Sequence, residues 1–75
     1  MSKKAEFWTK VNELRKKGLS EMDIRKELGL WIPKKYKEAE FISEMIYGTG
    51  GDYDARNRNR INVIKLLYFK EDEEE

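Results

Sequence analysis

Residues 11–30 read VNELRKKGLSEMDIRKELGL, and this stretch decides the expected fold because it holds two helical patterns on either side of a break. The break is at Gly18, which can adopt the left-handed conformation that ends a helix. After it, Ser20 is followed three residues later by Asp23, a capping pattern that opens a helix. We therefore expect one helix before Gly18 and another that begins at Ser20.

The spacing of the apolar residues predicts where each of these two helices begins and ends. On the first helix, three apolar side chains share one face: Phe7, Val11 and Leu14. Their steps of four and three residues predict a helix over residues 4–17. On the second helix, Ile24 and Leu28 share a face, and Gly29 is placed to end it. The second helix is therefore expected over residues 20–28.

Two further helices are expected downstream. Pro33 suits the first position of a helix, because its missing N–H needs no partner there, and this predicts a helix over residues 33–47. The apolar stripe of that helix consists of Phe41, Ile42, Met45 and Ile46. Residues 61–69 have helical spacing but are also rich in the β-branched and aromatic residues typical of strands. No second strand is evident to pair with them, which favours a helix over residues 56–70, with Asp54 as a plausible N-cap.

These elements predict an all-α protein, a compact bundle of three to four short helices in a single domain over residues 1–70. Residues 71–75, EDEEE, form an acidic tail that we expect to be disordered, since a block of like charges buries nothing. No apolar run is long enough to span a membrane, and the first residues carry no apolar signal region. The expected location is the cytoplasm.

The chain lacks the residue types on which most catalytic and metal sites depend. It contains no cysteine and no histidine, which removes thiolate zinc sites and the commonest general base. Ser20 and Ser43 therefore have no histidine to activate them, and residues 48–51, GTGG, lack the ending of a phosphate-binding P-loop. Asp52 and Asp54 alone supply too few oxygens for calcium. We expect no enzyme, no cofactor and no metal, and a function in binding another macromolecule.

The stretch from Val11 to Leu30 resembles the first two helices of a helix-turn-helix domain, with a Gly-Leu-Ser break and a short capped helix that ends in Leu-Gly. The resemblance covers residues 7–30. It implies that the helix after Pro33 is a recognition helix that enters the major groove of DNA. The first turn of that helix carries three cations near its positive end: Lys34, Lys35 and Lys37.

The expected recognition helix departs from the usual helix-turn-helix pattern in two ways. The turn at residues 30–33, LWIP, is one residue longer than usual. Glu40 and Glu44 are expected on the outward face of the helix, opposite its apolar stripe, where phosphates would repel them. Only the first turn of the helix is therefore expected to approach nucleic acid.

A second basic segment follows the glycine-rich loop at residues 56–60, RNRNR. Arginine and asparagine donate paired hydrogen bonds that suit guanine and adenine edges or phosphates. In a helix, Arg56 and Arg60 would share a face and Arg58 would point away. The alternative is that the arginines form ion pairs with Asp52, Asp54 or the acidic tail.

Two hypotheses of function follow. The leading one is a small regulator that binds DNA or RNA through a patch that brings together Lys34, Lys35, Lys37, Arg56, Arg58 and Arg60. It is supported by charge, since residues 1–37 hold 11 Lys/Arg against 5 Asp/Glu. The alternative is a protein-binding module, such as a phage- or plasmid-type inhibitor that docks on a host protein complex. Its interface would consist of Trp8, Trp31 (in the turn between helices), Tyr36 and Tyr47. A homodimer is compatible with both.

Overall fold

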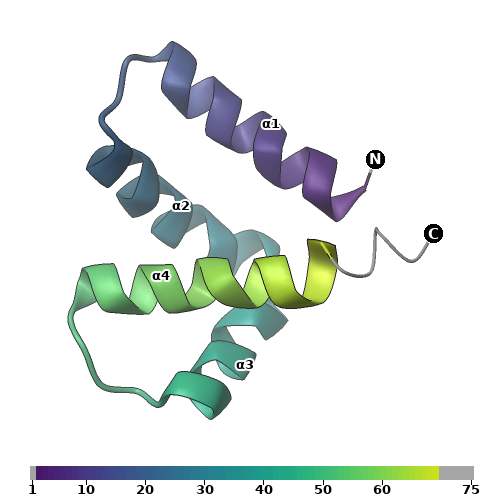
Figure 1. Ribbon diagram of the computed structural model, residues 1–75, viewed down its shortest axis with the longest axis vertical. Helices are drawn as coiled ribbons and strands as arrows, with labels where there is room; N and C mark the ends of the chain where they lie inside the picture. The colour runs from purple at the N-terminus through teal and green to yellow at the C-terminus, as the bar shows by residue number, and fades with distance from the viewer. Residues whose placement is uncertain (1, 70–75) are drawn as a thin grey trace.

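The structure is a computed structural model that describes residues 2–69, and this part of the chain is built of helices without strands (Figure 1). It contains four α-helices and a π-helical turn: α1 (Lys3–Lys16), α2 (Glu21–Lys35), α3 (Lys37–Tyr47), α4 (Tyr53–Ile64) and η1 (Lys65–Phe69). The expected all-α bundle is confirmed. Because α4 continues directly into η1, the strand alternative for residues 61–69 is wrong. The expected acidic tail, residues 71–75, lies outside the described residues.

The helices are arranged around the crossing of α2 and α4, with α1 and α3 on opposite sides of the molecule (Figure 1). α3 packs against α2 and α4, whereas α1 packs against α2 and η1. One core joins them: Phe7, Val11, Leu14, Ile24, Leu28, Ile32, Tyr36, Ala39, Val63, Ile64 and Tyr68. Within α3 itself, Ala39 is the one member of this core. That helix therefore contributes little apolar surface to folding.

The helix ends follow local capping rules. The Ser20 hydroxyl accepts a hydrogen bond from the Asp23 amide at 3.2 Å, which confirms the expected start of the second helix. Gly18 has a φ of 78°, so it supplies the left-handed residue after α1 as expected. Asp52, and not Asp54, caps α4 by accepting a hydrogen bond from the Ala55 amide at 2.8 Å. α4 consequently begins at Tyr53, earlier than predicted.

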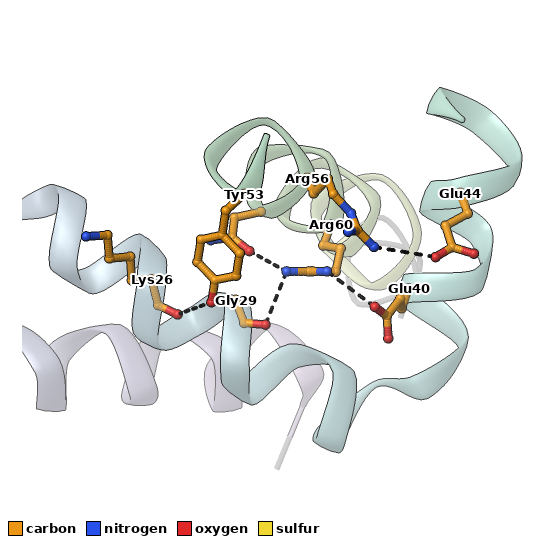
Figure 2. A network of polar contacts seen from close by, with 8 residues as sticks. Lys26, Gly29, Glu40, Glu44, Tyr53, Arg56 and Arg60 are labelled. Atoms are coloured by element: carbon orange, nitrogen blue, oxygen red, sulfur yellow. Dashed lines mark hydrogen bonds and ion pairs between the residues drawn. The ribbon is translucent and has the colours of Figure 1, made fainter. Parts of the chain in front are cut away.

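The predicted break at Gly29 is wrong, because α2 continues through it to Lys35 with Pro33 inside the helix. Proline has no N–H, so Pro33 leaves the Gly29 carbonyl without its usual helical donor. The Nη2 atom of Arg60 in α4 takes that place and donates to the Gly29 carbonyl at 3.2 Å (Figure 2). A donor from another helix thus compensates the proline.

Gly29 is needed for close packing rather than for a turn. A Cβ atom at this position would overlap the side-chain amide of Asn57 in α4. The Asn57 Oδ1 atom in turn accepts a hydrogen bond from Arg60. We refer to Gly29, Pro33, Asn57 and Arg60 as the α2–α4 junction.

Because α2 continues past Gly29, several residues between positions 31 and 37 belong to a different element than predicted. α3 begins at Lys37 and not at Pro33, after Tyr36 leaves helical geometry with φ −126° and ψ 74°. Lys34 and Lys35 therefore lie in the last turn of α2, and only Lys37 belongs to the first turn of α3. Trp31 also lies within α2 and not in a turn between helices.

Candidate functional site

The apolar stripe of α3 points toward solvent. Phe41, Met45 and Ile46 are 64%, 70% and 57% exposed, while Ile42 beside them is partly buried against the core. Phe41 and Met45 are four residues apart and lie on one face of α3, whereas Ile46 lies about 100° further round the helix, beside Met45. We call Phe41, Met45 and Ile46 the α3 face. The buried residues of α3 are instead the small Ala39 and Ser43.

The two glutamates that were expected to face solvent face α4 instead. The Oε1 atom of Glu40 lies 3.4 Å from Arg60 Nη1, and that of Glu44 lies 3.8 Å from Arg56 Nη2 (Figure 2). The side chains of Glu40 and Glu44 nevertheless remain 38% and 41% exposed. The predicted acidic face of α3 is therefore turned toward the arginines of α4 and only partly toward solvent.

The signal that sequence reasoning missed is the pair of small residues in α3. Ala39 and Ser43 are four residues apart and form a second possible packing face, on the other side of the helix from Phe41 and Met45. A helical projection of α3 alone favours burial of the large residues. The projection does not contain the arginines of α4, which pair with the glutamates of α3 in the structure.

The six predicted nucleic-acid contacts do not form one exposed patch. Arg60 is only 6% exposed. Arg56 pairs with Glu44, and Lys35 Nζ lies 2.9 Å from Glu6 Oε1. The remaining cations are exposed but lie on three different helices: Lys34, Lys37 and Arg58. Because α4 is helical, Arg56 and Arg60 share the side that meets α3, as predicted for a helix.

The four aromatic residues predicted for a protein interface are divided between the interior and the surface. Tyr36 is buried at 3% exposure, and Trp31 packs edge-on against its ring at 5.5 Å between centroids. Trp8 is 37% exposed but packs edge-on against Phe7 at 5.4 Å. Tyr47, the last residue of α3, is 43% exposed and lies next to Ile46 in sequence. Of the four, only Tyr47 adjoins the α3 face.

A polar contact holds the N-terminal end of α3 against η1. The Tyr68 hydroxyl donates a hydrogen bond to the Glu38 carboxylate. This bond lowers the pKa of Glu38 below its ordinary value, and the nearby charge of Lys3 contributes in the same direction. The Lys3 ammonium itself lies 4.1 Å from the centre of the Tyr68 ring. Three segments, α1, α3 and η1, thus meet at this contact.

The concave surfaces offer little to a ligand. A shallow groove of about 200 Å³ lies between α1, α2 and α4. Its apolar floor includes four residues that are each less than 5% exposed: Phe7, Val11, Ile24 and Leu28. Over residues 2–69 no group of three or more acidic side chains is placed to hold a metal ion. The helices of the same part of the chain are too short or too polar to cross a membrane.

Comparison with protein-family models, with curated proteins and with solved structures finds no match for this chain. The candidate site therefore rests on the geometry of the chain itself. Its most distinctive part is the α3 face.

Proposed function

We propose that this chain is a small, non-enzymatic protein-binding module and that the α3 face is its binding surface. The observation that carries the proposal is the exposure of Phe41, Met45 and Ile46, each above half, within six consecutive residues of one helix. Soluble proteins usually scatter exposed apolar residues singly, and a contiguous apolar patch rimmed by polar residues marks an interaction site.

The chemistry of the α3 face suits the centre of a protein interface. Interface centres are depleted in charged residues and enriched in aromatic residues and methionine. Phe41 provides a rigid anchor, whereas Met45 has a flexible side chain that adapts to the shape of a partner. Burying the exposed part of each of the three side chains would contribute about 1–2 kcal/mol. Two helical turns with such anchors fit the helix-in-groove and helix-on-helix modes of recognition.

The rim of the α3 face adds no large desolvation cost. Glu40 and Glu44 already have cationic partners within the chain, Arg60 and Arg56. A carboxylate that keeps its partner is less costly to cover than a free one. By contrast, nucleic-acid binding has weaker support, because three of its six cations are buried or ion-paired within the chain: Lys35, Arg56 and Arg60.

The proposal is tested by photo-crosslinking in expressing cells, with a diazirine amino acid in place of Met45. The matched control carries the same amino acid at Met22, which is 49% exposed on α2 and lies outside the α3 face. We expect protein adducts from position 45 that are absent from position 22 and that disappear when Phe41→Glu is added. Equal adducts at both positions, or none at position 45, would reject the α3 face as a binding surface.

A further inference from the structure

We infer that the partner of the α3 face is a second copy of this chain, so that two copies form a symmetric dimer through α3. The inference rests on the proposed function, because it names the partner for the same surface.

The α3 face is self-complementary when two copies of α3 run antiparallel across a two-fold axis. In such an isologous contact, residue i meets residue j and residue j meets residue i. An axis between Phe41 and Met45 places Phe41 of one copy against Met45 of the second, and the reverse. Lys37 lies four residues before Phe41 on the same side of the helix. Its ammonium then approaches the C-terminal end of the second copy's α3, where the helix dipole favours a cation.

Charge favours a second copy over a charged foreign partner. A two-fold contact brings like residues together, so an uncompensated acidic rim would repel its own copy. The rim of the α3 face reduces this repulsion, because the carboxylates of Glu40 and Glu44 lie 3.4 and 3.8 Å from arginine Nη atoms of the same chain. The whole chain carries a net charge of only +1, so two copies also do not repel at long range.

The size of the surface predicts a reversible dimer. In this arrangement Phe41 and Met45 of both copies supply four large side chains, each more than half exposed in the single chain. Four such side chains give a contact below the roughly 1,000 Å² of total buried area expected for a stable biological interface. We therefore expect a weak dimer whose monomer and dimer forms exchange.

The test is sedimentation equilibrium of the full purified chain over a wide range of concentrations. The expected result is a mass that rises from monomer to dimer with concentration and that changes little with salt, since apolar contacts drive the association. Met45→Glu should remain monomeric at every concentration. Met22→Glu, which adds the same charge at another exposed methionine, should still dimerise. Circular dichroism confirms that both variants remain helical.

The outcomes separate this inference from the proposed function. A chain that stays monomeric, together with adducts from position 45 to a different protein in cells, would overturn the second copy as partner and keep the protein-binding module. A monomeric chain without adducts at position 45 would overturn both. A dimer that Met45→Glu does not weaken would also overturn the inference, because it would form through another surface.

Discussion

The α2–α4 junction and the α3 face reverse the usual distribution of charge and apolar surface, but in different ways. At the junction, the guanidinium of Arg60 is buried and bonded to three acceptors, one each on Gly29, Asn57 and Glu40. On the α3 face, three large apolar side chains are exposed to solvent. The buried charge is explained by folding, because Pro33 leaves a carbonyl that needs a donor. The exposed apolar side chains keep most of their surface in water in the single chain, and the proposed partner would cover them.

The largest expected effect is on the junction. Arg60→Ala removes the donor to the Gly29 carbonyl and leaves Glu40 without its partner, so the free energy of unfolding should fall by about 3 kcal/mol. Urea denaturation of Arg60→Ala beside Arg58→Ala measures this loss. Arg58 is exposed on the same helix, and its substitution should change stability by less than about 0.5 kcal/mol. Equal losses for both variants would show that the buried contacts of Arg60 contribute nothing.

A smaller loss is expected from Gly29→Ala. The added methyl group overlaps the Asn57 side chain, so α2 and α4 must move apart, at a cost of about 2 kcal/mol. Thermal unfolding of the variant checks this. If alanine, the better helix former, instead stabilises the chain, then α2 and α4 do not pack as closely at this point as described.

The role of Pro33 is tested by a double-mutant cycle with Arg60. Pro33→Ala restores an N–H that can donate to the Gly29 carbonyl, so Arg60→Ala should be less harmful in that background by about 1 kcal/mol. The measurement is the free energy of unfolding of both single variants, the double variant and the original chain. Strict additivity would mean that Arg60 does not substitute for the helical donor that Pro33 lacks.

The contact between Glu38 and Tyr68 should make a modest, pH-dependent contribution. Because the pKa of Glu38 is lowered in the folded chain, its stabilising effect is present above the ordinary glutamate pKa. The effect is lost as the pH falls through the lowered pKa. Tyr68→Phe should therefore lower stability near neutral pH and make the acid part of the stability profile shallower. Unfolding midpoints measured across the acid range show whether the slopes of the two chains differ.

The fold could be predicted from the sequence wherever local chemistry decides the structure. The Ser20 cap and the Gly18 terminus need only neighbouring residues, and both are confirmed. The predicted boundary at Gly29 and Pro33 was wrong because either residue can lie at the end of a helix or inside it. Glycine can end a helix or allow close packing, and proline can begin a helix or interrupt its hydrogen bonds. Which use applies depends on Arg60, about 30 residues later in the chain. A distant residue thus decided whether α2 ends or continues.

The candidate site was harder to predict than the fold for the same reason. The residues of the α3 face were assigned to the core, since large apolar side chains usually face inward. Glu40 and Glu44 were assigned to solvent, since charges usually face outward. In the structure α3 buries Ala39 and Ser43 instead, and its two glutamates pair with arginines of α4 while staying partly exposed. Most of its large apolar side chains are left exposed. Only the relative placement of α3 and α4 reveals this.

The most direct test of the account is the stability of a chain in which Phe41 and Met45 are both replaced by glutamine. Measured by denaturant unfolding at a concentration too low for self-association, its free energy of unfolding should stay within about 0.5 kcal/mol of the original. Ile32→Ala, a fully buried reference in α2, should lose about 3 kcal/mol under the same conditions. A loss in the glutamine variant comparable to that of Ile32→Ala would place Phe41 and Met45 in the core and contradict the α3 face as a surface for binding.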